Sequence, residues 1–591
     1  MQTQRMILWI VFSMSLLFLW DAWQKHQGHP SLFGGAAPQA SAPAASDDGK
    51  PRIDASIPPS IVATSPAGRA AAATTATNGE QAPSGAVEPG TSAPGQSIRL
   101  ANDVLALDVS LTGGQIQRAE LLAYRDLNDR AHNLVLLKNQ PGALYLAQSG
   151  LVGGLVGGSV GGPGGAADSA GFPNHRTPMT RVDGGATPHV LADGGEAVKL
   201  SLVAESGGVR LVRTYTLARG AYVVQVKDEI TNVGATPARP VLYMQLTRDG
   251  HAPPGESKFY STYTGPVVYT DADKFQKVAF GDIDKGKAAH TASADNGWVG
   301  IIQHYFVSAW IPQAKVQREF YTRKVDANVY SVGIKEPLAD LAPQASVTVE
   351  SRLLVGPQDQ RMLEGIAPGL DLTVDYGWLT AIAQPIHWLM QKLHALVGNW
   401  GWAIVLLTIV VKTVFFPLQA ASYRSMARMK AVTPRLTALR ERYGNDRVKM
   451  NQAMMELYKT EKINPLGGCL PIVVQIPVFI ALYWVLLASV EMRDAPWIGW
   501  ITDLAAPDPY FILPLVMAGT MFIQVRLNPT PPDPLQAKMM MIMPLVFSVM
   551  FFFFPSGLVL YWLVNNVYSI AQQWVITRRI TQEAAAAKAR G

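Results

Sequence analysis

Only one cysteine, Cys469, occurs in the 591 residues, so the chain cannot form an internal disulfide. Aspartate, glutamate and histidine are absent from the apolar segments of the C-terminal third, which run from Trp402 to Leu418, Cys469 to Val490, Phe511 to Gln524 and Met539 to Ser569. These segments therefore cannot hold an aspartyl protease pair, a serine–histidine pair, an H-E-x-x-H zinc site or a carboxylate proton relay. We expect no enzyme activity, no cofactor and no metal.

Aromatic residues are nearly absent between Ser31 and Gln96, where proline, alanine, serine, glycine and threonine predominate. Such a composition cannot bury enough apolar surface to fold, so we expect a disordered tether. The insert "GLVGGLVGGSVGGPGG", from Gly150 to Gly165, is expected to be a disordered loop. "GDIDKGKA" from Gly281 has the spacing of a phosphate-binding loop, but Ala288 replaces the hydroxyl residue that would hold magnesium, so no nucleotide site is expected.

Long apolar segments are what the chain does contain. A membrane span needs about 20 residues, so the run from Met539 to Ser569 is too long for one helix and is expected to divide at Pro555 and Gly557. Met6 to Trp20 follows Arg5 and has no small-x-small cleavage site close behind it, so we interpret it as an uncleaved anchor. Together with the other apolar segments, this predicts six spans.

The charges beside these segments predict their orientation. Residues 419–465 hold ten lysines and arginines against four acidic residues, whereas residues 491–510 hold one arginine against four acidic residues. The positive-inside rule places the first loop in the cytoplasm and the second outside, with both termini cytoplasmic. The net charge of +6 is thus attributed to membrane topology, and we expect no DNA binding.

A region of more than 350 residues lies between the first two spans and is predicted to be outside the membrane. From Ile98 onward it contains short alternating runs such as "VLALDVSL", "VRLVRTYTL" and "YVVQVKDEI", separated by clusters of glycine, asparagine, aspartate and proline. This pattern predicts an all-β sandwich that ends near "SVTVESRLLVG".

An amphipathic helix is predicted directly before the second span. Its apolar face consists of Trp378, Ile382, Ile386, Leu389, Leu393 and Val397. Gln391, Lys392 and His394 lie off that face. We expect the helix to lie flat in the outer interface, anchored by Trp400 and Trp402, and a buried helix of the outer domain is the alternative.

The basic cytoplasmic loop is predicted to form a helical hairpin. Apolar residues recur at steps of three or four at Met426, Met429, Val432, Leu436, Leu439 and Tyr443. After the break "GND" at Gly444 to Asp446, a second helix is marked by Val448, Met454, Met455 and Tyr458. The basic residues expected to contact a partner are Arg424, Arg428, Lys430, Arg435, Arg440 and Arg442. A nascent chain or ribosomal RNA is one such partner; alternatively, the two stripes only pack on each other and the charges are solvated.

Polar side chains within the spans are the candidate binding residues. Thr408 and Lys412 share one helical face, Trp562, Asn565 and Asn566 share another, and Gln475 and Gln524 add amides. If these groups converge, they line a hydrophilic pocket. For Lys412 the alternative is snorkelling toward the cytoplasmic surface, about 10 Å of helix away.

Four longer motifs resemble a known family. "NPLGGCLPIVVQIPVFIALYWVL", "DPYFILPLVMAGTMF" and "FPSGLVLYWLVNN", with "DLTVDYGWL" before them, are similar to the YidC family of membrane protein insertases of Gram-negative type. The resemblance implies five core spans around a hydrophilic groove that is open to cytoplasm and lipid. It also implies an outer β-super-sandwich, a cytoplasmic hairpin required for insertion and a basic tail near the ribosome.

The family's groove carries a positive residue, usually arginine, on its first core span, and Lys412 stands at that position. Trp562 corresponds to the groove aromatic, while Thr408 and Gln524 match polar groove positions. The substrate groove is therefore assigned to Thr408, Lys412, Gln475, Gln524, Tyr561, Trp562, Asn565 and Asn566.

We therefore expect a polytopic α-helical membrane protein with a large extracytoplasmic β-sandwich, acting as an insertase and chaperone in the bacterial inner membrane. The expected partners are nascent membrane proteins, the ribosome, Sec translocon components and membrane lipids. A small-solute transporter or channel is the alternative, although the spans lack the acids that ion coupling uses. A sugar-binding outer sandwich is a third possibility.

The expected domain boundaries follow from these segments. They are an anchor at 1–23, a tether at 24–97, the β-sandwich at 98–370, the interfacial helix at 371–399, spans at 400–418, 467–490, 511–525, 538–554 and 558–576, the hairpin at 419–466, an outer loop at 491–510, a cytoplasmic loop at 526–537 and a basic tail at 577–591.

Overall fold

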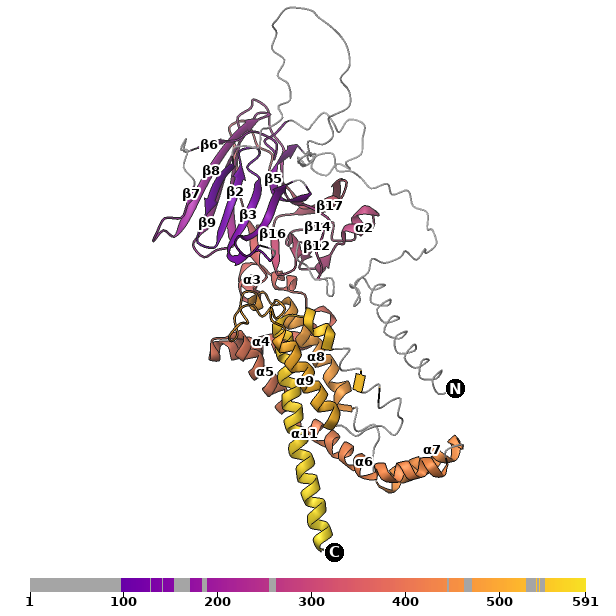
Figure 1. Ribbon diagram of the computed structural model, residues 1–591. Coiled ribbons are helices and arrows are strands. Elements are labelled where there is room, and N and C mark those ends of the chain that lie inside the picture. Colours follow the sequence, from indigo (N-terminus) through magenta and orange to yellow (C-terminus); the bar gives the residue numbers. More distant parts are fainter. Residues whose placement is uncertain are drawn as a thin grey trace, which may run out of the picture. The chain divides into compact units, whose positions relative to one another are not determined.

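The chain divides after Thr373 into two compact units, which we call the sandwich unit and the helical unit. The computed structural model (Figure 1) describes residues 97–127, 129–140, 142–153, 171–182, 189–253, 262–443, 446–461, 470–527, 538, 541–542 and 548–590. The predicted anchor and tether, the glycine-rich insert beyond residue 153 and most of the predicted fifth span lie outside these residues. The loop prediction is wrong for Gly150 to Gly153, which end a strand (Ala143–Gly153) and pair with residues 240–243.

The sandwich unit contains two sheets whose strands are antiparallel, except for the parallel pair β1 and β7. The ten-stranded sheet has the order β14 (Ser293–Ala294), β17 (Arg318–Asp326), β18 (Val329–Pro337), β11 (Pro240–Asp249), β5 (Ala143–Gly153), β4 (Asn133–Gln140), β3 (Ile116–Arg125), β2 (Leu105–Ser110), β1 (Ser97–Ala101) and β7 (His189–Val190). The nine-stranded sheet has the order β13 (Lys274–Lys277), β12 (Gly265–Thr270), β15 (Trp298–Gln303), β16 (Phe306–Pro312), β19 (Ser346–Pro357), β10 (Val223–Asn232), β9 (Val209–Ala218), β8 (Ala197–Ser206) and β6 (Thr180–Arg181). The described residues of the unit also form three short helices, α2 (Phe280–Asp284), α3 (Gln360–Ile366) and η2 (Leu370–Thr373).

Alternation of apolar and polar residues explains why the strands of the nine-stranded sheet have one buried face. In β9 and β10 every second residue is buried, which is the periodicity of a strand with one wet face. β16 differs, because all of its residues are buried. Trp298 and Trp310 are among the largest fully buried side chains, and the Trp310 indole donates to the Gln245 carbonyl oxygen at 3.1 Å.

An ion pair is buried between β9 and β10, where Arg213 and Asp228 stand directly opposite each other. Arg213 Nε donates to Asp228 Oδ1 at 2.6 Å and Arg213 Nη2 donates to Asp228 Oδ2 at 2.9 Å. Arg213 Nη1 donates to the Ser149 carbonyl oxygen at 3.2 Å, which links the pair to β5 of the other sheet. This bidentate geometry compensates for the cost of removing both charges from water.

The described residues of the helical unit form helices of different lengths. They are η3 (Gly377–Leu379), α4 (Thr380–Val397), α5 (Trp400–Val414), α6 (Phe416–Arg442), α7 (Arg447–Thr460), α8 (Leu470–Ala488), η5 (Val490–Met492), α9 (Ile512–Leu527), η6 (Phe551–Phe553) and α11 (Ser556–Arg590). Figure 1 shows α11 running beside α9 and continuing past it to the C-terminus. The predicted last span and basic tail thus form one continuous helix.

The predicted second span is bent. α5 ends at Val414, and the chain turns by 63° before α6 continues from Phe416. Pro417 lies in the first turn of α6 and has no N–H for the Thr413 carbonyl oxygen, so the hydrogen-bond ladder is interrupted there.

Helix length and hydropathy indicate which described helices are candidates to cross a membrane. Within the described part of the chain, no single helix is both long enough and apolar enough to cross a bilayer. The bent pair Trp400–Val414 and Phe416–Ser425 meets the test jointly, and Gln475–Ala488 and Ile512–Leu527 are shorter apolar helices.

The buried face of α4 differs from the apolar face that is predicted to lie in the outer interface. α4 packs against α5 and α8 through Ala383, Ile386, His387 and Met390, which are all buried. Of the predicted apolar residues, Val397 is exposed and Ile386 is buried; Trp388, which the predicted face omits, is exposed. The buried face includes one polar residue, His387, whose Nε2 lies 3.5 Å from Glu491 Oε1.

Candidate functional site

A chain of hydrogen bonds joins four helices in the interior of the helical unit. Lys412 Nζ of α5 donates to Ser569 Oγ of α11 at 2.7 Å and to Gln419 Oε1 of α6 at 3.4 Å. Gln419 Nε2 donates to Gln475 Oε1 of α8 at 3.2 Å, and Gln475 Nε2 donates to Asn565 Oδ1 of α11 at 3.2 Å. We call these five residues the polar network.

Local structure explains how the polar network assembles. Lys412 lies in the last turn of α5, and Gln419 lies in the first turn of α6, just past the bend at Phe415. Asn565 and Ser569 are four residues apart on α11 and therefore share one face. Tyr423 of α6 donates to the Ser569 carbonyl oxygen at 3.5 Å, so α6 and α11 are also joined directly beside the network.

Lys412 is 3% exposed, and it forms no ion pair with any residue that the structure describes. A buried ammonium without a carboxylate is costly, so the neutral oxygens of Ser569 and Gln419 must replace part of its hydration. Its head group points to these residues of neighbouring helices rather than along α5 toward the end of the predicted span. This geometry favours the pocket interpretation over snorkelling.

The other predicted groove residues have varied surroundings. Thr408 is buried, and its hydroxyl donates to the Ile404 carbonyl oxygen of its own helix at 2.7 Å. Asn566 Nδ2 lies 3.5 Å from Thr520 Oγ1 of α9. The Gln524 side chain forms no hydrogen bond with any described residue, so its place in the groove stays a prediction.

Tyr561 and Trp562 belong to an aromatic cluster beside the polar network. The ring of Trp562 meets Phe479 of α8 edge-on at 4.5 Å between centroids, and it meets Phe551 at 5.5 Å. Tyr561 stacks on Phe479 at 6.0 Å. The network thus has an apolar wall at one end, formed by η6, α8 and α11.

Sequence reasoning missed Gln419, Ser569, Tyr423 and Thr520. A signal was available on α11, where Asn565, Ser569 and Gln572 recur at steps of four and three within an apolar segment. Gln419 is the first residue of the hairpin predicted for 419–466, and the bend that turns it toward the network was not predicted.

The hairpin forms a small core of its own. Val432 and Leu436 of α6 are buried and pack with Met454, Leu457 and Tyr458 of α7. Val448 and Met455 lie in α7, but both are exposed and take no part in this packing. Neighbouring methionines at 454 and 455 cannot both face α6, since adjacent helical residues point about 100° apart.

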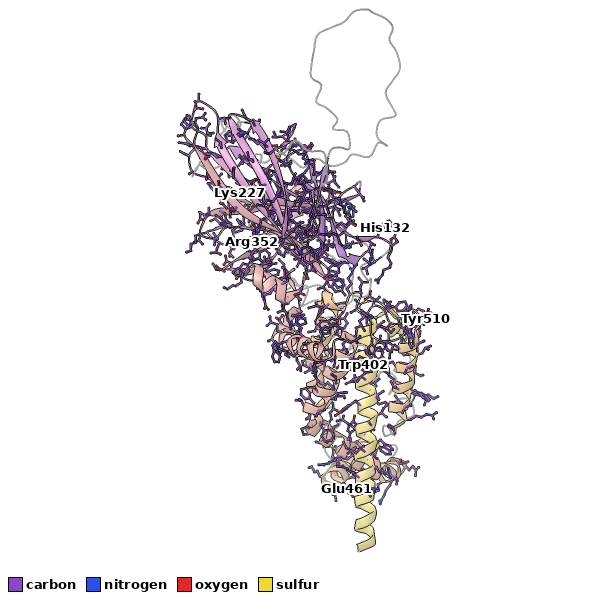
Figure 2. All side chains as sticks on the ribbon, turned by 90° about the vertical axis from the view of Figure 1, so that its left-hand side faces the viewer. His132, Lys227, Arg352, Trp402, Glu461 and Tyr510 are labelled. Atoms are coloured by element: carbon purple, nitrogen blue, oxygen red, sulfur yellow. The ribbon has the colours of Figure 1, made fainter. Side chains whose placement is uncertain are left out.

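The hairpin's predicted basic residues differ in their contacts. Arg424 is exposed, Arg435 forms an ion pair with Glu461, and Arg442 lies 5.7 Å from the ring centre of Tyr443. The side chains of Arg428, Lys430 and Arg440 lie outside the described residues. Figure 2 labels Glu461, the acidic partner at the end of the hairpin.

A hollow of about 670 Å³ lies on the nine-stranded sheet. Lys227 and Arg352, both labelled in Figure 2, line it together with Glu229 and Glu350. Lys227 Nζ lies 2.6 Å from Glu229 Oε1, and Glu350 stands opposite Lys227 in the sheet register. Positive and negative side chains alternate across the floor of this hollow.

Within the described residues, no group of three or more histidine, cysteine, aspartate or glutamate side chains is placed to hold a metal ion.

Comparison with known proteins identifies the family. A family model described as YidC periplasmic domain matches residues 97–389, and one described as 60Kd inner membrane protein matches residues 392–583. A protein of Cupriavidus necator named Membrane protein insertase YidC is 52% identical over 592 residues, with 100% of both chains covered. One of Bordetella pertussis with the same name is 52% identical over 99% of this chain and 100% of its own.

A solved structure titled "Active YidC insertase crystal structure with the first transmembrane domain resolved" covers 81% of this chain and 92% of its own, with 16% identity and a TM-score of 0.38. The sequence matches define an inner-membrane protein with a periplasmic β-sandwich domain. The chain belongs to the YidC family of membrane protein insertases, which are not enzymes.

Proposed function

We propose that this protein inserts newly made proteins into the inner membrane and helps them fold, alone or beside the Sec translocon. The observation that carries the proposal is the polar network around Lys412, which lies among apolar helices and contains an ammonium with no described acidic partner. A buried cation of this kind lowers stability, so its presence indicates a functional role.

The proposed topology has six spans, with both termini and the hairpin in the cytoplasm and the β-sandwich in the periplasm. The excess of basic residues in 419–465 supports it. We propose the same domain boundaries that the sequence predicts. The basic hairpin and the tail after residue 577 contact the ribosome, while the helical unit contacts lipid and Sec components.

In the proposed mechanism, the polar network provides a hydrophilic site part-way across the bilayer. The polar N-terminal tail of a client enters among α5, α6, α8 and α11, where Lys412 attracts its acidic residues and the amides of Gln475 and Asn565 replace hydration. Moving polar backbone through hydrocarbon is costly because its hydrogen-bonding groups find no partners there. The network lowers that cost over part of the distance, and the client's apolar segment then leaves into lipid.

Replacement of Lys412 tests this mechanism. In cells depleted of the parent protein, we expect Lys412→Arg to support insertion of a single-span client with a short acidic tail. Lys412→Met and Lys412→Ala should lower insertion about tenfold, the effect of roughly 1.4 kcal/mol, and Lys412→Glu should lower it further by repelling the tail. Insertion is measured by protease protection of the tail after a short labelling pulse.

Lys392→Ala is the matched control, because Lys392 is an exposed lysine of the same unit. It should leave insertion unchanged. Full activity of Lys412→Ala would contradict the role of the charge, and normal client insertion after depletion of the whole protein would contradict the insertase function itself.

A further inference from the structure

Gln572 of α11 is a buried amide that has no hydrogen-bond partner among the described residues. It is 6% exposed, and neither Oε1 nor Nε2 forms a hydrogen bond. Its neighbour Gln573, by contrast, donates from Nε2 to the Leu527 carbonyl oxygen of α9 at 3.2 Å. Buried amides are almost always paired, because an unpaired one forfeits the hydrogen bonds that it made to water.

The position of Gln572 links it to the polar network. It follows Asn565 by seven residues, which is two helical turns, so both amides lie on one face of α11 about 10 Å apart. Ser569, the acceptor of the Lys412 ammonium, lies between them on the same face. Tyr423 of α6 bonds to the Ser569 carbonyl oxygen one turn before Gln572, so α6 covers this part of α11. Gln572 therefore extends the network toward the C-terminal end of α11.

The chemistry of an amide restricts what can satisfy it. The carboxamide has one acceptor oxygen and two N–H donors, so a complete partner must offer both an acceptor and a donor. A lipid acyl chain offers neither, and a lone anion or cation offers one kind. A peptide group offers a carbonyl oxygen and an N–H that match the two sides of the carboxamide.

We propose that Gln572 binds backbone peptide groups of the client's polar tail on the cytoplasmic side of Lys412. This proposal rests on the insertase function above and assigns to that function a recognition site that does not depend on client sequence. In the structure the Gln572 amide is buried, and it forms no hydrogen bond with a described residue. Separation of α6 from α11 opens it for an extended segment, which exchanges its hydration for the Gln572 amide before it reaches Lys412.

The isosteric change Gln572→Leu separates this role from a structural one. Replacing an unpaired buried amide by an apolar side chain of similar size should preserve or raise the thermal stability of the protein. Insertion should nevertheless fall by about two- to tenfold, the effect of losing one neutral hydrogen bond of ordinary strength. The fall should be equal for clients whose tails are acidic, neutral or basic, whereas Lys412→Ala should affect mainly the acidic tail. Gln572→Met serves as a second isostere if Gln572→Leu does not fold.

A crosslinking experiment on the full-length protein gives an independent readout. A photoreactive amino acid at position 572 should form adducts with the tail of a stalled client, while the same group at Val575, on the exposed side of α11, should not. Normal insertion by a folded Gln572→Leu variant together with absent adducts at 572 would overturn the proposal and leave water as the partner of the amide. If depletion of the wild-type protein left insertion unchanged, the insertase function itself would fail, which is a distinct outcome.

Discussion

At the scale of single residues, the sequence indicated most members of the polar network but did not indicate which of them pair. Lys412, Gln475 and Asn565 could be proposed because polar residues are conspicuous in apolar segments. Their pairing could not be, because Ser569 lies 157 residues after Lys412 and Gln419 faces inward only because the helix bends. Periodicity reports the face of one helix and carries no information about which distant helix that face meets.

The buried pair of Arg213 and Asp228 gives a prediction for the sandwich unit. Arg213→Met should lower the free energy of unfolding by about 3 kcal/mol or more, because it leaves the Asp228 carboxylate buried without its charged partner. The double change Arg213→Met with Asp228→Leu should recover most of that loss. Urea unfolding of a fragment of residues 97–373 measures both values.

The exposed pair of Arg239 and Asp340 is the matched control. Its N–O distance is 3.1 Å, yet Arg239→Met should change the free energy of unfolding by less than about 1 kcal/mol, since water screens exposed charges. Equal losses for the two arginine changes would contradict the assignment of the cost to burial.

At the scale of elements, the hairpin shows where a local pattern is sufficient and where it fails. The "GND" sequence was a strong turn signal, and the structure has α6 ending at Arg442 and α7 beginning at Arg447 after the Asp446 cap, whose carboxylate accepts from the Lys449 N–H. The packed residues of α7 were less predictable. Met454, Leu457 and Tyr458 form its inner face, and two neighbouring methionines fit either of two faces by spacing alone.

This small core predicts a marginally stable hairpin. Leu436→Ala should remove about 2 kcal/mol of packing energy between α6 and α7, because Leu436 is one of two buried residues in the cluster. Hydrogen–deuterium exchange of the α7 amides should become more than tenfold faster. Met455→Ala, at a half-exposed position of the same helix, should leave the exchange rate unchanged, and a similar acceleration in both variants would contradict the assigned faces.

At the scale of the whole molecule, the β-sandwich could be predicted and its strand order could not. Alternating runs identify strands with one wet face such as β9 and β10, but β5 is buried along nearly its full length and pairs with β11, which begins 87 residues after β5 ends. The local alternation of apolar and polar residues gives no information about such long-range strand pairing. The division at Thr373 likewise depends on contacts, since the family model for the periplasmic domain extends to residue 389 and includes half of α4.

The long-range pairing of the sandwich unit also buries a carboxylate, and this gives a pH-dependent stability. Glu336 of β18 is 3% exposed, and its Oε2 has no hydrogen-bond partner among the residues described. Arg318 is the charge that acts on it, but the Arg318 guanidinium is bonded to the carbonyl oxygens of Gln313, Val316 and Gly297. Burial raises the pKa of the Glu336 carboxyl above its ordinary value of 4.5, and Arg318 offsets only part of that rise.

A raised pKa in the folded state means that folded Glu336 holds its proton more tightly than unfolded Glu336. The free energy of unfolding contributed by this group is therefore fully present below pH 4.5 and decreases as the pH rises through the folded pKa. Glu336→Gln should match the parent at low pH and exceed it by about 1 kcal/mol or more near neutral pH, because burial disfavours the ionised form of the Glu336 carboxyl. Urea unfolding of residues 97–373 across this range tests it, with Glu364→Gln on the exposed side of α3 as a control whose difference from the parent should not vary with pH. A Glu336→Gln advantage that is the same at every pH would show that the carboxyl has the same pKa in the folded and unfolded states, and the stabilisation would then come from packing rather than from charge.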